Sequence, residues 1–184
     1  MDIFKERRSI RKFTQEKIPA EILDYIADCG RVAPSAANVQ PIKLCIITQK
    51  AKEIFPLTKW AGYLPEWSPS EEESPAAYIA LIADKSIKQN EQFELDAGIT
   101  GTAMIYAAES KGVSSCWLGA INREEISKIL ELPENQKLLY LIAFGYADQK
   151  SKICDDDNDI KYKMDENGAV TVPKRSFEAV VSYK

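Results

Sequence analysis

Two apolar runs of strand length constrain this fold more than any other feature of the sequence. The segments AYIALIA (77–83) and KLLYLIAFGYA (137–147) contain few polar residues that could alternate with the apolar ones. A strand that is apolar on both faces is buried on both faces, so other elements must cover a central sheet on each side. The length of 184 residues fits one such core, or a core with an arm.

Helical and strand-like patterns alternate around these two runs. Asp2 can cap a short helix through Arg8, and the next helix should begin near Pro19 and end before Pro34. The same reasoning predicts a strand at 42–47, a broken helix within 51–67, a polar loop at 68–75, a strand with a turn at 113–120 and an Asn-capped helix at 122–132. Together these elements predict an α+β or α/β sandwich.

The longest predicted helix spans residues 89–111 and carries apolar side chains all round. Such a helix is surrounded by protein rather than by water. Gly98 and Gly101 lower its helix propensity, which is acceptable if they let another backbone approach closely.

The C-terminal segment contains a turn signal between two strand-like stretches. Residues 160–164 (IKYKM) and 169–172 (AVTV) flank the sequence DENG, which predicts a β-hairpin with Asn167 and Gly168 at its turn. Three aspartates before this hairpin have the spacing of a calcium loop, but Ile160 stands where that loop requires glycine. We therefore expect a solvated acidic loop and no metal site.

The composition excludes several classes of function. The formal net charge of −4 argues against broad nucleic-acid binding. No apolar run is long enough to cross a bilayer and the N-terminus lacks a signal-peptide pattern, so we expect a cytoplasmic protein. The four cysteines form neither a CxxC pair nor a zinc knuckle. Because there is no histidine, an enzyme of this sequence must use carboxylates, hydroxyls, thiols or a bound cofactor.

One dense basic stretch, RRSIRKF (7–13), stands out in this acidic chain. If the stretch is extended, Arg7, Ser9 and Arg11 point to one side; if it is helical, Arg7 and Arg11 share a face one turn apart. In either conformation two guanidinium groups and a hydroxyl can converge on a phosphate. The alternative is a solvated basic turn whose surface ion pairs contribute little. The stretch alone leaves both open.

Three later stretches could complete a ligand site, and each has a plain structural alternative. In PSAANVQP (34–41), the amides of Asn38 and Gln40 could bind the edge of a planar heterocycle or satisfy the backbone of their own loop. Gly119, after the strand in CWLGA, could offer its N–H to a ligand or form a strand-to-helix turn. The two cations of PKRS could add to an anion site or precede a short helix as an ordinary charged pair.

In this order and at these intervals, the four stretches resemble the nitroreductase family of FMN enzymes. The resemblance rests on RRSIRKF, APSAANVQPIKLCII, DAGITGTAMIYAAESKGVSSCWLGAINREEI and PKRSFEAVV, which together span most of the chain and look like a short subgroup. It implies an α+β fold, a three-layer α/β/α sandwich with a mixed, largely antiparallel sheet. It also implies a single domain over 1–184, in which about 150–184 form the hairpin and a C-terminal arm that reaches the partner subunit of a homodimer.

The resemblance also implies where FMN binds. Basic residues from both ends of the chain would hold its phosphate and ribityl chain, the loop after the first long helix would contact the ring of the partner subunit's flavin, and the N–H of Gly119 would face flavin N5. The implied cofactor-binding residues are Arg7, Arg8, Ser9, Arg11, Pro34, Ser35, Ala36, Asn38, Gln40, Leu118, Gly119, Lys174 and Arg175. The region 48–77 is shorter than in larger members, so a flavin contact by Lys59 or Trp60 and substrate contacts by Trp60, Tyr63 or Trp67 stay open.

The expected reaction is hydride transfer from NAD(P)H through flavin N5 to nitroaromatic, quinone or similar electron-poor acceptors, by a ping-pong mechanism. No side chain is expected to be an indispensable acid or base. The main alternative is an FMN-binding protein without rapid turnover, a carrier or redox sensor. A third possibility, an anion- or nucleic-acid-binding module built on RRSIRKF, would be colourless and would bind with strong salt dependence.

Overall fold

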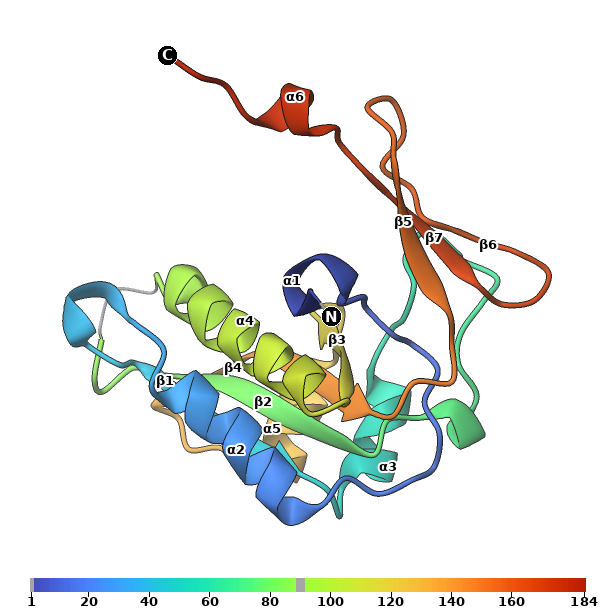
Figure 1. Ribbon diagram of the computed structural model, residues 1–184. Helices are drawn as coiled ribbons and strands as arrows, with labels where there is room; N and C mark the ends of the chain where they lie inside the picture. The colour runs from blue at the N-terminus through green and yellow to red at the C-terminus, as the bar shows by residue number, and fades with distance from the viewer. Residues whose placement is uncertain (1, 89–91) are drawn as a thin grey trace.

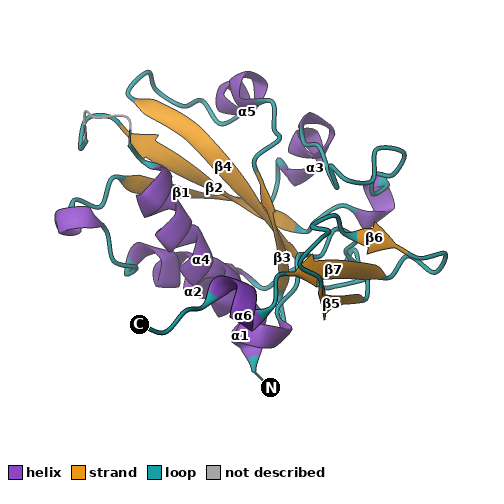
Figure 2. Cartoon of the chain, turned by 90° about the horizontal axis from the view of Figure 1, so that it is seen from above, coloured by secondary structure: helices purple, strands orange, loops and turns teal. Residues whose placement is uncertain are grey.

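The computed structural model describes residues 2–88 and 92–184, and its centre is a four-stranded sheet between two layers of helices (Figure 1; Figure 2). The strands have the order β1-β2-β4-β3, and each neighbouring pair is antiparallel. Their bounds are Ile42–Ile47 for β1, Ala77–Asp84 for β2, Ser114–Leu118 for β3 and Gln136–Gly145 for β4. The two apolar runs are therefore the two central strands, and the prediction that both are buried is confirmed.

Strand β2 shows why the sheet is covered on both sides. All eight of its residues are buried. Alternate side chains, such as Tyr78 and Ile82, belong to one apolar cluster, whereas Ile79 and Leu81 belong to a second cluster on the other face. Helices α2 (Ala20–Arg31) and α4 (Glu94–Ser110) cover one face, and α3 (Ala51–Ile54) and α5 (Arg123–Ile129) cover the other (Figure 2).

The predicted helix starts agree with the structure, but the first helix is shorter than predicted. The Asp2 carboxylate caps α1 (Ile3–Glu6), and the side chain of Asn122 caps α5 by accepting from the N–H of Glu125 at 3.2 Å. The predicted helix through Arg8 ends early because Arg7 adopts an extended conformation with ψ 133°. The broken helix of 51–67 consists of α3 and a 3-10 turn, η2 (Phe55–Leu57), and no helix follows before residue 67.

Helix α4 confirms the longest predicted helix from residue 94 onward, while residues 89–91 of that prediction lie outside the described part of the chain. Within one chain the helix is not covered all round, because Leu95 is 67% exposed. A Cβ at Gly98 would meet nothing within 4 Å, whereas one at Gly101 would lie 2.1 Å from the Trp117 ring. Gly101 therefore admits an indole rather than a backbone, and Gly98 faces open space.

A second, three-stranded sheet and a projecting arm follow the main sheet. Strands β6 (Lys163–Met164) and β7 (Val170–Lys174) form the predicted hairpin, in which Gly168 has a φ of 77°. Strand β5 (Ser151–Asp155), which was not predicted, pairs with β7 in parallel. Helix α6 (Phe177–Val180) and the last residues extend away from the main body (Figure 1).

Candidate functional site

The basic stretch 7–13 is extended and runs beside the edge strand β3. Ser9 forms a parallel bridge with Ser115, and the N–H of Ile10 donates to the Ser115 carbonyl at 3.0 Å. Ile10 and Phe13 are buried, so the segment is fixed to the sheet by backbone hydrogen bonds and by two apolar side chains. The extended alternative is therefore correct and the helical one is wrong.

Arg7 and Ser9 line a pocket of about 220 Å³ between this segment, α4 and β3. Among the described residues, those that line the pocket include one arginine and several hydroxyl-bearing residues, and none of them carries a carboxylate. Its remaining lining residues are Thr102, Ile105, Tyr106, Ser115 and Trp117. Because guanidinium and hydroxyl groups donate hydrogen bonds, this set of donors suits an oxyanion such as a phosphate.

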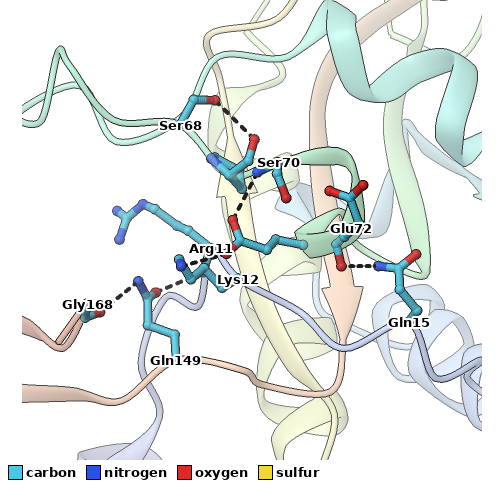
Figure 3. Close-up of polar contacts among 10 residues, drawn as sticks. Arg11, Lys12, Gln15, Ser68, Ser70, Glu72, Gln149 and Gly168 are labelled. Carbon is cyan, nitrogen blue, oxygen red and sulfur yellow. Dashed lines mark hydrogen bonds and ion pairs between the residues drawn. The ribbon is translucent and has the colours of Figure 1, made fainter.

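The other two arginines of the stretch do not line this pocket. Arg8 turns back on α1, where its guanidinium donates to the carbonyls of Lys5 and Arg7. The Arg11 guanidinium lies over the ring of Tyr162 at 4.6 Å, and its backbone N–H donates to the side chain of Gln149 at 3.2 Å (Figure 3). The structure thus brings Arg7 and Ser9 together at the pocket and directs Arg8 and Arg11 elsewhere.

The loop 68–75 is attached to the basic segment along its length. The Glu73 carboxylate forms an ion pair with Lys12 at 2.6 Å, and the Glu73 backbone carbonyl accepts from the N–H of Phe13 at 3.0 Å. The side-chain amide of Gln15 donates to the carbonyl of Glu72 at 2.8 Å (Figure 3). In this structure the loop supports residues 12–15.

The loop 34–41 carries backbone strain. Ala37, Asn38 and Gln40 have φ angles of 50°, 55° and 54°, in the left-handed region that residues other than glycine rarely adopt. The short helix η1 (Ala36–Asn38) forms the turn of this loop. Such strain persists only where the surroundings hold it in place.

A buried carboxylate holds this loop against α4. Asp96 is 1% exposed, its Oδ1 accepts from the N–H of Ala36 at 3.0 Å, and its Oδ2 pairs with the Lys88 ammonium at 2.9 Å. Burial by itself raises the pKa of Asp96, but the hydrogen bonds from Lys88 and Ala36 outweigh it and hold the pKa below its usual value. Asp96 is therefore a charged anchor for the loop.

Gln40 makes its hydrogen bonds within this loop. The Gln40 side chain donates to the Asn38 carbonyl at 3.1 Å, and the Gln40 N–H donates to the Ser35 hydroxyl at 2.9 Å. Gln40 thus satisfies the backbone of its own loop, as the structural alternative predicts. Pro34, Ala36 and Asn38 are exposed.

The loop and the Arg7 pocket lie at different positions along α4. Asp96 contacts the loop, whereas Tyr106, ten residues further along α4, lines the pocket. Since an α-helix rises 1.5 Å per residue, Tyr106 lies about 15 Å from Asp96 along the helix axis, and Thr102, which also lines the pocket, lies about 9 Å from it. One chain therefore does not bring the loop and the basic segment into a common site.

The segment after β3 presents an exposed backbone. Leu118 is buried and Gly119 is exposed, and the Gly119 carbonyl accepts from the Arg123 guanidinium at 3.0 Å. The exposed Lys59 lies next to it, because the Lys59 N–H donates to the Ala120 carbonyl at 2.9 Å. Trp60, in contrast, is 8% exposed and belongs to an apolar cluster, so its indole does not face a substrate.

The cations of PKRS lie on the projecting arm. Lys174 is the last residue of β7, and the Arg175 guanidinium donates to the Ala179 carbonyl of α6 at 2.8 Å. Neither residue lines the pocket that contains Arg7. Asp157, in the acidic loop before the hairpin, holds the arm instead, because its carboxylate accepts from both the N–H and the hydroxyl of Ser176 at 2.8 Å.

Comparison with known proteins identifies the family. Residues 4–146 match the Nitroreductase family. The chain belongs to the nitroreductase family. It is 30% identical over 163 residues to an NAD(P)H FMN reductase of Bacillus subtilis, covering 80% of this chain and 66% of that protein. An FMN-dependent nitroreductase from Clostridium difficile R20291 has the same fold, with a TM-score of 0.68, 25% identity and coverage of 82% of this chain and 88% of its own.

A second solved structure extends the likeness of fold to the C-terminal segment of this nitroreductase-family chain. A nitroreductase family protein from Clostridium difficile 630 has a TM-score of 0.68 at 22% identity, and the match covers 99% of this chain and 96% of that one. The predicted family, the α+β class and the oxidoreductase class are confirmed. None of the described helices is long and apolar enough to cross a membrane. Within the described residues, no group of three His, Cys, Asp or Glu side chains could hold a metal ion.

Two residues that shape the site were missed in the sequence. Ser115 lies in the apolar strand β3, and Asp96 lies near the start of the apolar helix α4; both are 1% exposed. A polar residue inside an otherwise apolar segment was the available signal, since burying such a group costs free energy unless it is hydrogen-bonded or paired with a charge. A third contact, the Tyr162 ring under Arg11, joins segments 151 residues apart and had no local signal.

Proposed function

We propose that this chain is an FMN-dependent oxidoreductase that uses NAD(P)H to reduce nitroaromatic, quinone or similar electron-poor acceptors. The single observation that carries the proposal is the pocket beside β3, where Arg7 and three side-chain hydroxyl groups stand near the buried hydroxyl of Ser115. FMN is the cofactor supported by the family and by the named relatives. Its 5′-phosphate is an oxyanion, so it fits a pocket that offers donors and no carboxylate.

Residues from two segments would hold FMN. Arg7 and Ser9 bind the phosphate end, and the exposed backbone at Gly119 faces the ring end. When bound, FMN would supply the N5 atom that accepts a hydride and passes it on, which is chemistry that amino-acid side chains do not provide. The protein's part is to fix the ring, exclude competing groups and supply positive charge.

We further propose that the working unit is a homodimer with FMN sites at its interface, formed by residues 1–184 as one domain per chain. Leu95 is exposed and Gly98 faces open space, so α4 presents an uncovered apolar face. In a symmetric dimer the loop 34–41 of one chain can lie near the pocket of the other, which one chain alone does not achieve. The exposed apolar residues Phe177 and Val180 make the arm suited to packing on the partner.

The test of activity is anaerobic reduction of the reconstituted protein. We expect a yellow protein whose visible absorption band is bleached by NADH or NADPH and returns when a quinone or a nitroaromatic compound is added. Bound FMN that neither nucleotide reduces would favour the alternative of a carrier or redox sensor. A colourless protein that cannot be reconstituted would contradict the proposal. The cytoplasm, which supplies NAD(P)H, is the proposed location.

The test of assembly uses one charged substitution on the uncovered face of α4. Leu95→Glu places a carboxylate in the proposed interface, so we expect it to shift the protein from dimer to monomer in sedimentation velocity and to weaken FMN binding. Ile87→Glu, at another exposed apolar residue, is the control and should sediment like the wild type. A dimer that tolerates Leu95→Glu would exclude this face of α4 as the interface.

A further inference from the structure

Ser115 is a buried hydroxyl that the chain leaves without a partner. The residue is 1% exposed, and its Oγ makes no hydrogen bond to any part of the chain that the structure describes. A buried polar group without a partner is less favourable than one whose hydrogen bonds are satisfied. An alanine would avoid this cost in β3, so folding by itself gives no reason for serine at this position.

The side chain of Ser115 lies on the face of β3 that meets α4. The residues that follow Ser115 alternate between the two faces of the strand. Cys116 and Leu118 pack in the apolar cluster of the opposite face, whereas Trp117 packs with the cluster on the α4 side. Because side chains alternate along a strand, Ser115 and Trp117 share a face, and both line the pocket with Arg7. Ser115 thus lines the pocket, and its unpartnered hydroxyl lies on the side of β3 that faces the pocket.

The backbone fixes Ser115 relative to the other donors. The bridge between Ser9 and Ser115, and the hydrogen bond from the Ile10 N–H to the Ser115 carbonyl at 3.0 Å, hold the two strands in register. Ser9 and Ser115 therefore lie directly opposite each other, one on the basic segment and one on β3, and both line the pocket. Such a pair is set before any ligand arrives, and no loop has to move to form it.

One carboxylate near the pocket bears on the charge of the ligand. Glu109 is close enough to Arg7 and Arg8 to interact with both charges, but it does not line the pocket. Burial raises the pKa of Glu109, while the two arginines oppose that shift. Because no carboxylate lines the pocket itself, the space beside Ser115 and Arg7 is left for an anion.

We propose that the Ser115 hydroxyl donates a hydrogen bond to the phosphate of FMN and is a binding residue alongside Arg7 and Ser9. This inference rests on the proposed function. It assigns to β3 a role in binding the phosphate end of the cofactor, in addition to the backbone that follows β3 at the ring end. A hydroxyl is neutral and adds a directed donor without adding further charge.

The proposal predicts opposite effects on folding and on binding. Ser115→Ala removes the unsatisfied hydroxyl, so the variant without cofactor should melt at the same temperature as the wild type or at a higher one. The same change should weaken FMN binding about tenfold, the size of effect expected for one lost hydrogen bond to a charged group. Riboflavin, which has no phosphate, should bind the variant and the wild type equally.

The experiment is a titration of each protein with FMN and with riboflavin, followed by quenching of flavin fluorescence, together with thermal unfolding of the cofactor-free proteins. Ser114→Ala is the matched control, because Ser114 is the adjacent serine of β3 and points to the other face. The control should keep the wild-type ratio of FMN to riboflavin affinity. Inorganic phosphate should compete with FMN on the wild type and more weakly on Ser115→Ala.

Three results would overturn the inference. If Ser115→Ala binds FMN as the wild type does, the hydroxyl is not a ligand of the phosphate. If the variant loses FMN and riboflavin affinity equally, the hydroxyl acts elsewhere on the flavin. If the cofactor-free variant is strongly destabilised, its role is structural. A wild-type protein that binds neither flavin would instead overturn the proposed function, so the two failures are distinguishable.

Discussion

The basic segment 7–13 and the loop 34–41 lie at different positions along α4, and they are held in place in different ways. The basic segment is held by backbone hydrogen bonds, such as those from the N–H of Ile10 to the Ser115 carbonyl and from the N–H of Phe13 to the Glu73 carbonyl, both at 3.0 Å. The strained part of the loop is held by side chains, above all by the carboxylate of Asp96.

This difference determines how each region responds to substitution and to pH. Backbone hydrogen bonds do not depend on which side chains are present or on their ionisation, so the basic segment keeps its place whether or not Arg7 and Ser9 bind a ligand. The loop depends on an ionised carboxylate that is paired with an ammonium group. Removal of that carboxylate should release the strain in the loop.

The largest effect is expected from Asp96→Ala. The substitution removes the acceptor of the Ala36 N–H and leaves the Lys88 ammonium without its carboxylate, which should lower the free energy of unfolding by about 3 kcal/mol. Asp96→Asn keeps an oxygen that can accept from Ala36, so its loss should be smaller. Urea unfolding of the three proteins measures both. Equal and small losses for the two variants would show that the loop does not depend on this anchor.

The next largest effect is expected at the basic segment, on binding rather than on stability. Arg7→Ala removes the one guanidinium that lines the pocket, which should weaken FMN binding about 30-fold, equivalent to about 2 kcal/mol. Arg8→Ala is the matched control, because Arg8 donates to backbone carbonyls of its own segment; it should change the affinity less than about threefold. Equal losses for the two variants would contradict the assignment of Arg7 to the phosphate.

A smaller effect is expected from Lys12→Ala, which breaks the ion pair with Glu73 but leaves the backbone hydrogen bond between Phe13 and Glu73 in place. Because the pair is partly exposed, the free energy of unfolding should fall by less than about 1 kcal/mol. FMN affinity should stay within about twofold of the wild type, since Lys12 does not line the pocket with Arg7. A large loss of affinity would mean that the loop 68–75 shapes the site through this pair.

The last effect is a dependence on pH at Asp84, the buried carboxylate that pairs with Lys43 of β1, and this effect is lost in acid. Hydrogen bonds from Lys43 and then Ser86 lower the pKa of Asp84 to about 2. A carboxyl whose folded pKa is depressed contributes stability above its unfolded pKa of about 4, and loses it as the pH falls toward 2. The difference in melting temperature between the wild type and Asp84→Asn should therefore shrink from pH 5 to pH 2. A constant difference would show that the charge of Asp84 does not stabilise the fold.

Much of the fold was predictable because its signals are local. The apolar runs of β2 and β4, the Asn122 cap and the turn at Gly168 each depend on a few neighbouring residues, and all agree with the structure. The extra strand β5 was not predictable in the same way, because it is exposed and depends on pairing with β7. The end of α1 before Arg7 likewise depends on a partner, strand β3.

The candidate site shows a similar division. The sequence by itself determined that this chain has a sheet covered on both faces, that it lacks histidine chemistry and that its basic stretch can bind an anion, since these follow from residue types and their periodicity. Only the tertiary structure decided which arginine faces the pocket, that Ser115 lies there without a partner and that Asp96 holds the loop. These features depend on contacts between residues distant in the chain, and no local pattern encodes such contacts.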